Sequence, residues 1–321
     1  MTSGAETLAS PVDPGFVLEE DCVPRGPYQL PGAGRDGVLR REGSALRRLL
    51  HPGGEPCEVR AWVSGGAVRL RASAASAEAV EAGLERMRFA LCLDHDLSDF
   101  HRRFGRDPLI GPVVRARPWT RPRRRPEPFE ALAWAICEQL VEGSRAVDIQ
   151  RALVRRHGRR SACGRLRDAP SAELVADRSP AELERCGLSP KRAITMMKAA
   201  REVASGRADL SEHEPSWRRL RRINGLGSWT LEKLAYEGQG RDDKLPAGDL
   251  DYLKVVGRLA DLGRRATESE VRDFFAPYAP YEGLAGTYAL SAAHWPVRGG
   301  LTGPGNRRRS GSGASRAWAP R

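Results

Sequence analysis

The chain has 321 residues, of which 40% are hydrophobic and 29% are charged, and it contains no apolar run long enough to span a membrane. This length corresponds to about two domains and excludes a single small module. The formal net charge of +12 indicates a polyanionic partner, but residues 297–321 alone supply six arginines, so the rest of the chain is only mildly basic.

Both ends of the chain are expected to be disordered, because residues 1–14 and the basic tail 297–321 are rich in serine, proline and glycine. The first residues lack the pattern of a secretory signal, so we expect a cytoplasmic protein with reduced thiols. The six cysteines are at least 23 positions apart, much farther than paired metal ligands. We therefore expect no metal cluster and mostly buried thiols, Cys137 and Cys186 among them.

A small α+β domain is predicted over residues 15–108. Two stretches that alternate in polarity, 58–63 and 67–72, flank Ser64-Gly65-Gly66 and indicate a β-hairpin. A helix is predicted to follow over 77–91, where apolar residues recur at helical spacing.

An all-helical domain is predicted over residues 109–296, which makes the fold class α+β. Ser179-Pro180 and Ser189-Pro190 each combine an N-cap with a first-turn proline, and Thr267 to Glu270 forms a capping box. A core-facing helical stripe is predicted at Phe129, Leu132, Ala133, Ile136, Cys137 and Leu140.

Two other patterns have ordinary alternatives. Gly32 to Gly37 matches the dinucleotide-binding pattern G-x-G-x-x-G, but it follows Pro31 and no βαβ unit surrounds it, so a glycine-rich turn is expected. Arginines 121 and 123–125 lie among prolines, where a solvated linker and a phosphate contact are equally compatible with the sequence.

Residues 217–238 predict two helices joined by a tight hairpin, Asn224-Gly-Leu-Gly227, with Ser228 as the N-cap of the second helix. Gly225 and Gly227 would let the backbone approach a ligand closely, and the N-terminus of the second helix would favour a phosphate. Two helices joined by Gly-x-Gly are also found as plain connectors. Asp249, which follows a Pro and Gly turn at the start of the next helix, favours a functional hairpin.

The segments Asn224-Gly-Leu-Gly-Ser-Trp-Thr230 and Pro246-Ala-Gly-Asp249 resemble the helix-hairpin-helix DNA glycosylases, in particular the 3-methyladenine DNA glycosylase II branch. Residues 129–141 are similar to the first core helix of this family, and residues 186–193 to its Gly-Leu-x-x-Lys-Arg-Ala segment. The resemblance covers residues 109–295 and implies that the N-terminal domain is TBP-like.

The resemblance implies a nucleoid-associated monomer that acts on double-stranded DNA in base excision repair, with no membrane partner. It also implies that the protein needs no cofactor, and a structural monovalent cation at the hairpin is left open. The expected substrates are alkylated purines of the 3-methyladenine and 7-methylguanine class.

Residues at matching positions take their roles from the resemblance. Asp249 becomes the catalytic aspartate, with Asp251 as its rival. Trp229 stands where lyase-type relatives carry a nucleophilic lysine, which implies a monofunctional enzyme. Leu140 matches the apolar wedge that replaces the flipped nucleotide, and an ordinary core leucine is the alternative. The base pocket is expected to include Trp229, Lys233 and Gln139. The residues expected to contact DNA are Gly225, Gly227, Ser228 and Leu140.

The residue types suit the removal of an alkylated base. Alkylation at a ring nitrogen makes a purine cationic and a good leaving group, so a carboxylate need only stabilise the oxocarbenium-like sugar. The indole of Trp229 would attract such a cation.

Departures from the family pattern affect base specificity: Lys233 would repel a cationic base, and Pro280-Tyr-Glu282 and Leu290 also differ. The alternatives are therefore the same fold acting on a deaminated or other damaged base, and a catalytically silent DNA-binding protein.

Overall fold

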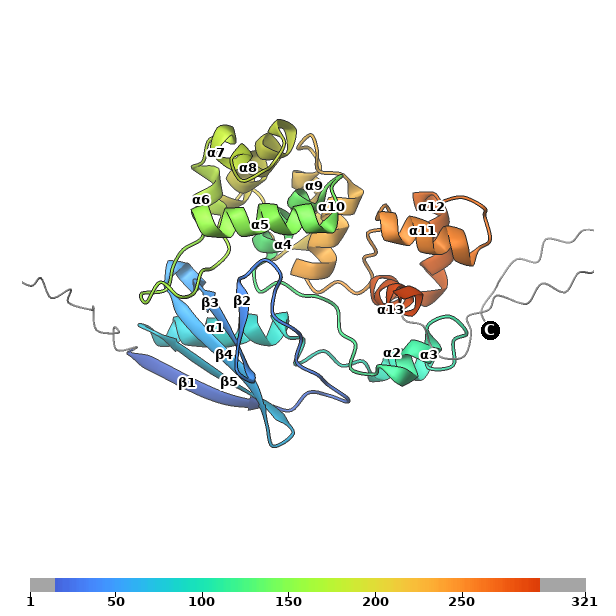
Figure 1. Ribbon diagram of the computed structural model, residues 1–321, viewed down its shortest axis with the longest axis horizontal. Coiled ribbons are helices and arrows are strands. Elements are labelled where there is room, and N and C mark those ends of the chain that lie inside the picture. The colour runs from blue at the N-terminus through green and yellow to red at the C-terminus, as the bar shows by residue number, and fades with distance from the viewer. Residues whose placement is uncertain (1–14, 295–321) are drawn as a thin grey trace, which may run out of the picture. The chain divides into compact units, whose positions relative to one another are not determined.

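The computed structural model describes residues 15–294, which form two compact units (Figure 1). Within that range, unit 1 contains residues 15–25, 30–95 and 123–239, and unit 2 contains residues 26–29, 96–122 and 240–294. Each unit thus combines segments that are distant in sequence. The predicted domains, residues 15–108 and 109–296, describe the order along the chain, and their boundary stays a prediction. The predicted tails 1–14 and 297–321 lie outside the described residues. None of the helices in the described range is long and apolar enough to cross a bilayer.

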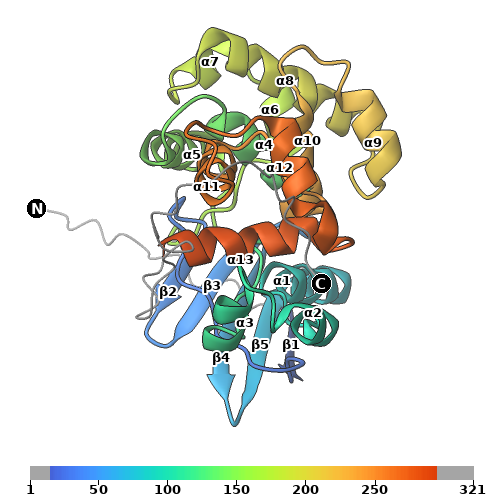
Figure 2. The same ribbon diagram turned by 90° about the vertical axis from the view of Figure 1, so that its right-hand side faces the viewer.

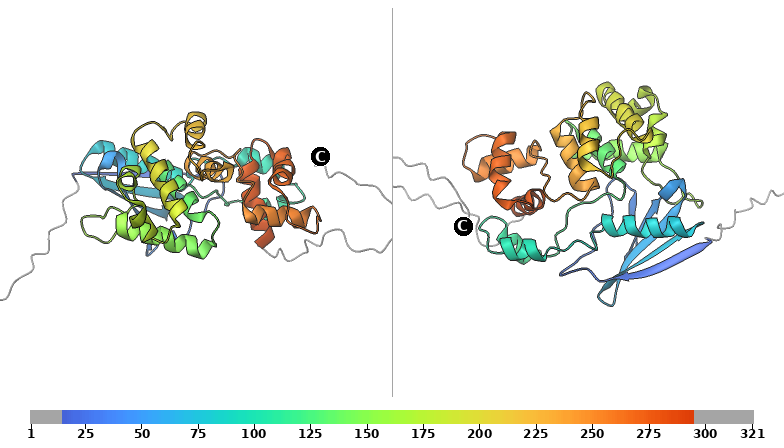
Figure 3. Two further views of the ribbon diagram at one scale, coloured as in Figure 1. Left: turned by 90° about the horizontal axis from the view of Figure 1, so that it is seen from above. Right: turned by 180° about the vertical axis from the view of Figure 1, so that it is seen from behind.

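Unit 1 contains a five-stranded antiparallel sheet with the strand order β1-β5-β4-β3-β2. The strands are β1 (Phe16–Cys22), β2 (Leu39–Glu42), β3 (Ala45–Leu50), β4 (Cys57–Ser64) and β5 (Ala67–Ala74). The predicted hairpin is confirmed as β4 and β5, with Gly65 and Gly66 at φ values of 59° and 85° in its turn. The predicted helix is α1 (Ala77–Ala90), which packs across one face of the sheet (Figure 3).

The glycine-rich segment 32–37 forms a turn between β1 and β2, as expected, in which the Gly37 amide donates to the Gly34 carbonyl at 3.2 Å. This turn buries Asp36, whose carboxylate accepts a hydrogen bond of 2.9 Å from the Trp134 indole and pairs with Arg125 at 2.8 Å. The segment therefore anchors the sheet to the helices of unit 1.

The helical part of unit 1 surrounds a core that includes Leu132, Trp134 and Met196. Ser179 and Ser189 cap the helices that follow them, as predicted. The helices are α4 (Pro128–Glu138), α5 (Gly143–His157), α6 (Ala172–Ala176), α7 (Pro180–Glu184), α8 (Pro190–Ala204), α9 (His213–Leu220) and α10 (Ser228–Lys233), and α10 continues into the π-helical turn η2 (Leu234–Gly238).

A buried charge cluster joins the sheet to these helices. Arg48 of β3 lies 2.5 Å from Glu130 of α4 and 3.6 Å from Asp168, and His51 lies 2.9 Å from Asp168. Removing one member would leave a buried charge without its partner, which typically costs about 3–5 kcal/mol. The cluster therefore makes the sheet and the helices interdependent.

The arginines between residues 121 and 125 are mostly engaged inside the protein. Arg125 contacts Asp36 and Glu130, and the buried Arg124 lies 4.9 Å from the ring centre of Tyr236. The solvated-linker interpretation is therefore wrong for Arg124 and Arg125, and their internal partners also exclude the phosphate contact for these two. Arg123 is exposed.

Unit 2 is helical and has its own core, which includes Phe100, Phe275 and Tyr288. Its helices are α2 (Ser98–Phe104), α3 (Gly111–Ala116), α11 (Leu250–Leu259), α12 (Glu268–Phe275) and α13 (Glu282–His294), and a 3-10 turn, η3, covers Ala276–Tyr278. Helix α13 packs against α3, α11 and α12 (Figure 2). The capping box at Thr267 is confirmed. The all-helical prediction is also confirmed for residues 109–294, apart from an isolated β-bridge between Arg160 and Arg167.

Candidate functional site

The predicted hairpin connects α9 to α10 and depends on one of its two glycines for packing. Gly225 has a φ of 98°, and a Cβ at this position would lie 2.5 Å from Oγ1 of Thr195. A Cβ at Gly227 would meet nothing within 4 Å. Gly225 is therefore required by the protein itself, whereas Gly227 faces open space.

Helix α10 begins one residue earlier than predicted. Its N-cap is Gly227, in an extended conformation, and no side-chain cap hydrogen bond forms there. Ser228 is the first helical residue, so its assignment as the N-cap is wrong. Because Gly227 is extended, the turn of the hairpin ends at this residue, and the helix starts immediately after it.

Gln139 positions the hairpin from the end of α4. Its side-chain nitrogen lies 2.8 Å from both the Gly225 carbonyl oxygen and Oγ1 of Thr230. From the other side, the Thr195 hydroxyl lies 3.0 Å from the Asn224 carbonyl oxygen. The hairpin is therefore held by side chains of α4 and α8 as well as by its own backbone.

Leu140 is fully exposed, with a relative accessibility of 105%, and has a left-handed φ of 53°. Helix α4 ends at Glu138, before the helical stripe predicted from Phe129 would have placed Leu140 in the core. The core alternative for Leu140 is therefore wrong. Leu140 is a large, exposed apolar residue, and it directly follows Gln139, which bonds to the hairpin. This position is compatible with the wedge role, which stays a prediction.

Lys233 lies beside Trp229 but does not present an unpaired charge. Its Nζ is 5.5 Å from the centre of the Trp229 ring, 2.5 Å from Glu138 and 3.1 Å from Glu237. We call Lys233, Glu138 and Glu237 the lysine triad. With both carboxylates ionised, the triad has a formal charge of −1.

The triad stabilises its own charged state. Burial alone lowers the pKa of Lys233, but the carboxylates of Glu237 and Glu138 outweigh it and raise this pKa above its ordinary value. Burial also raises the pKa of Glu237, but Lys233 and then Arg125 lower it below its ordinary value. Lys233 is therefore held as an ammonium ion, which is a poor nucleophile.

Asp249, in unit 2, is the N-cap of α11. Its Oδ1 accepts a hydrogen bond of 3.0 Å from the Asp251 amide, and its own amide donates to the Pro246 carbonyl at 2.9 Å. The turn that starts at Pro246 and the cap together hold this half-buried carboxylate in one orientation.

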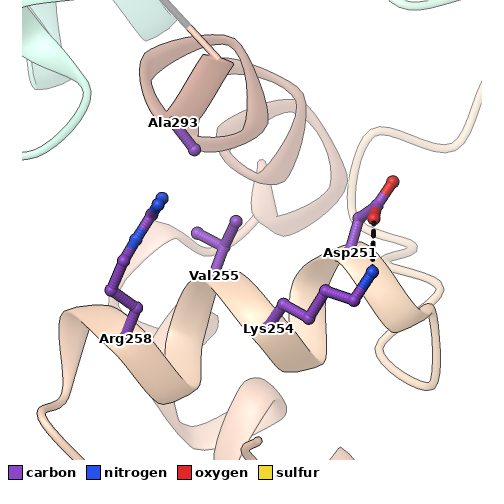
Figure 4. A pocket seen from close by; sticks show the side chains of 5 residues that line it. All are labelled: Asp251, Lys254, Val255, Arg258 and Ala293. Carbon is purple, nitrogen blue, oxygen red and sulfur yellow. Dashed lines mark ion pairs between the residues drawn. The ribbon is translucent and has the colours of Figure 1, made fainter.

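The rival carboxylate, Asp251, lies in the first turn of α11 and lines a surface pocket of about 400 Å³ (Figure 4). Its Oδ1 is 3.9 Å from Nζ of Lys254, so it already has a cationic neighbour. The other lining residues are Val255, Arg258 and Ala293. Asp249 is not among them, so the two carboxylates have different surroundings.

The predicted residues thus form two groups. The hairpin, Gln139, Leu140, Trp229 and Lys233 belong to unit 1, and Asp249 belongs to unit 2. Sequence analysis missed Thr195, Glu138 and Glu237. Of these, Glu237 could have been found, because it follows Lys233 by four residues on the same helix face.

Comparison with known proteins shows which family and relatives this chain resembles. Residues 133–280 match the HhH-GPD superfamily base excision DNA repair protein. A DNA-3-methyladenine glycosylase of Bacillus subtilis is 23% identical over 61% of this chain and 67% of its own length.

Two solved structures are similar in fold. The 3-methyladenine DNA glycosylase of Archaeoglobus fulgidus superposes with a TM-score of 0.69 at 19% identity, over 86% of this chain and 96% of that protein. A 3-methyladenine DNA glycosylase of Schizosaccharomyces pombe, in complex with abasic DNA, superposes with a TM-score of 0.50 at 26% identity, over 58% of this chain and 92% of that protein.

Proposed function

Since residues 133–280 match the HhH-GPD superfamily base excision DNA repair protein, we propose that this protein belongs to that superfamily and is a monofunctional DNA N-glycosylase that excises alkylated purines, of the 3-methyladenine and 7-methylguanine class, in base excision repair. The observation that carries the proposal is Asp249, a carboxylate fixed at the N-cap of α11 after a Pro and Gly turn within this domain. The solved relative on abasic DNA supports double-stranded DNA as the partner.

In the proposed reaction the damaged nucleotide leaves the stack before its base is removed. Extruding a base costs a few kcal/mol, and least for a damaged pair. Leu140 would fill the space in the duplex, and its exposed, left-handed position presents the side chain without a rearrangement of α4. The hairpin, with Gly225, Gly227 and Ser228, would hold the phosphate backbone without reading the sequence.

Asp249 would act on the sugar as the N-glycosidic bond breaks. The departing base takes the bonding electron pair, the sugar gains oxocarbenium character, and the fixed carboxylate stabilises that positive charge. A water molecule then adds to the anomeric carbon and loses its proton, for which the same carboxylate is a suitable acceptor. Cationic purines need little further activation, so a single carboxylate is sufficient.

The lysine triad removes the main objection to a cationic substrate. A lone lysine next to Trp229 would repel a methylated purine, but Lys233 is paired with Glu138 and Glu237. The formal charge of the triad itself is therefore negative, and Arg125, 3.7 Å from Glu237, is shared with Asp36 and Glu130. The pairing of Lys233 thus removes its repulsion of a cation near the indole. Because no nucleophilic amine occupies position 229 and Lys233 is held as an ammonium ion, the enzyme would lack lyase activity.

Several finer features belong to the same proposal. We propose that the five-stranded sheet with α1 is TBP-like, that the enzyme acts as a monomer at the nucleoid in the cytoplasm, and that it needs no cofactor. A structural monovalent cation at the hairpin stays an open part of the proposal, and the carbonyl oxygens of Asn224 and Gly225 there already accept hydrogen bonds from Thr195 and Gln139.

The decisive experiment is base release from methylated duplex DNA by the purified protein. We expect free 3-methyladenine and 7-methylguanine, and no release from unmethylated DNA. Duplexes that contain hypoxanthine or uracil test the deaminated-base alternative in parallel. Binding without release from any of these substrates would contradict the proposal and identify a silent DNA-binding protein.

A further inference from the structure

Five arginines of unit 1 gather on a surface that the proposed reaction does not use. We call Arg40, Arg155, Arg160, Arg165 and Arg167 the arginine patch. Arg40 comes from β2, Arg155 from the end of α5, and the other three from the loop between α5 and α6, which reaches down beside the sheet in Figure 1.

The patch is held in place by its own side chains and backbone. Arg40 donates to the Arg165 carbonyl at 2.8 Å, and Arg167 donates to the Arg155 carbonyl at 2.7 Å. The loop is a small hairpin in which the Ser161 amide donates to the Leu166 carbonyl at 3.1 Å. Leu166 is buried, which fixes the loop against the body of unit 1.

The patch has no carboxylate counterions within the described residues, and its one anionic neighbour is the thiolate of Cys163, which interacts with Arg165. Among residues 15–294, no carboxylate lies within 4.0 Å of any of its five guanidinium groups. Burial, followed by the charges of Arg160, Arg40 and Arg155, lowers the pKa of Arg167 below its ordinary value. Glu42 interacts electrostatically with Arg165 at longer range, but it is already paired with Arg47 at 2.8 Å.

Other arginines of unit 1 provide an internal comparison. Arg69 pairs with Asp21 at 2.7 Å, Arg71 with Glu19 at 3.1 Å, and Arg88 with Asp94 at 2.7 Å. Each of these three surface arginines on the sheet or on α1 is therefore neutralised by a carboxylate. The lack of one in the arginine patch leaves a concentrated positive surface, where like charges repel unless an anion binds.

We propose that the arginine patch binds backbone phosphates of duplex DNA, at a second place separate from the hairpin. This inference rests on the proposed function, which takes duplex DNA as the substrate. The patch contains no large exposed apolar side chain. Phosphate contacts do not need one, whereas a protein partner would normally bury an apolar centre.

The second contact lies well away from Leu140. The part of α5 from Gly143 to Arg155 separates the chain near Leu140 from the patch, a length of about 18 Å at 1.5 Å per residue. This corresponds to about five base pairs at 3.4 Å each. The patch would therefore engage the duplex outside the segment that carries the lesion.

The first test compares two triple variants with equal loss of charge. The patch variant is Arg155→Gln, Arg160→Gln and Arg165→Gln, which spares the two side chains that bond to backbone carbonyls. The control variant is Arg69→Gln, Arg71→Gln and Arg88→Gln, whose arginines are paired. The affinity of the full chain for an undamaged duplex of about 30 base pairs is measured at several salt concentrations.

We expect the patch variant to lose about tenfold or more in affinity, and its slope of log affinity against log salt to fall by about two to three, because each phosphate contact contributes about 0.9. The control variant should change by less than about twofold. On a duplex of about eight base pairs with a central abasic site, the patch variant should bind like the unchanged protein, because the abasic site holds this duplex at Leu140 and its end does not reach the patch. Equal losses in both variants on the long duplex would overturn the inference.

Cys163 supplies an independent readout, because this exposed thiol lies within the patch loop. Hydrogen bonds from Ser161 and from Arg165 lower the pKa of Cys163 to about 7, so the thiol reacts readily at neutral pH. In a Cys22→Ser background, alkylation of Cys163 by iodoacetamide should slow when the long duplex is added. Protection by polyglutamate but not by the duplex would overturn the inference in favour of an acidic protein partner.

The inference and the proposed function fail in different ways. If only the patch inference is wrong, base release from methylated DNA persists while the patch and control variants bind DNA equally. If only the glycosylase proposal is wrong, no base is released, but the patch variant still loses affinity for the long duplex.

Discussion

A Cβ at Gly225 would lie 2.5 Å from Oγ1 of Thr195, so the hairpin and α8 touch at a point where only glycine fits. Gly225→Ala should therefore lower the free energy of unfolding, by about 1–3 kcal/mol, as well as DNA affinity. Gly227→Ala should leave stability within about 0.5 kcal/mol but still weaken binding, because its Cβ would enter the space proposed for a backbone phosphate.

Urea unfolding and duplex binding of the two variants separate these effects. In the proposed function the hairpin contacts phosphate and not bases, so damaged and undamaged duplexes should lose affinity by the same factor. A loss confined to damaged DNA would instead assign the hairpin to the base pocket.

Asp249→Asn should reduce base release by about a hundredfold or more, since the carboxylate acts on charge that develops in the transition state. Asparagine is an equally good N-cap, so the fold and the binding of abasic DNA should persist. Single-turnover excision measures the first effect and duplex titration the second. Asp251→Asn is the matched control, and if it proved the more damaging change, the catalytic role would move to Asp251.

Borohydride should not trap a covalent complex between the protein and damaged DNA. Trp229 has no amine, and the pKa of Lys233 is raised by its two carboxylate partners, so no free amine is available to form a Schiff base. The measurement is a denaturing gel after reduction, with a lyase-type glycosylase as positive control. A trapped band that disappears in Lys233→Met would show that Lys233 loses its proton during the reaction and forms the Schiff base.

Glu138→Gln should lower the excision of cationic 7-methylguanine relative to neutral hypoxanthine by about threefold or more, because the formal charge of the lysine triad changes from −1 to 0. The ratio of single-turnover rates for the two bases is the quantity to measure. Glu268→Gln, which removes an exposed carboxylate paired with Arg272, is the control. An unchanged ratio in Glu138→Gln would exclude the triad from base selection.

Glu202 should contribute to stability only above acidic pH. Hydrogen bonds from Arg219 and Arg207 lower its pKa from 4.5 to about 2, so its contribution is fully present above pH 4.5 and is lost as the pH falls from 4.5 towards 2. Glu202→Gln should therefore destabilise the protein at pH 7 and have progressively less effect below pH 4.5. Urea unfolding across this range provides the comparison, and a constant difference between the two proteins would contradict the assignment.

Local patterns predicted the elements whose signals lie close together in sequence. The β4–β5 hairpin was found because polarity alternates on either side of Gly65-Gly66, and the caps at Ser179 and Thr267 were found because each is defined within four residues. Strand β3 was not found. All but one of its residues are buried, Arg48 included, so its sequence has no alternation to detect.

The candidate site was predictable in part for the same reason. The hairpin and Asp249 follow from their glycines and turns. The end of α4 could not be predicted in this way, because the apolar spacing continues to Leu140 although the helix stops at Glu138. The partner of Lys233 was also hidden, since Glu138 is 95 residues away and only the folded chain brings the two together.

The interleaving of the two units has a consequence for how the protein is made. The polypeptide passes from one unit to the other five times, at residues 25, 29, 95, 122 and 239. No single contiguous stretch of the gene therefore encodes either unit, so truncations would expose incomplete cores. During synthesis, Arg48 emerges from the ribosome before Glu130 and Asp168, its buried partners. The sheet therefore cannot complete its buried ion pairs until the helices have been translated. Until then the nascent chain exposes surface that is prone to aggregation.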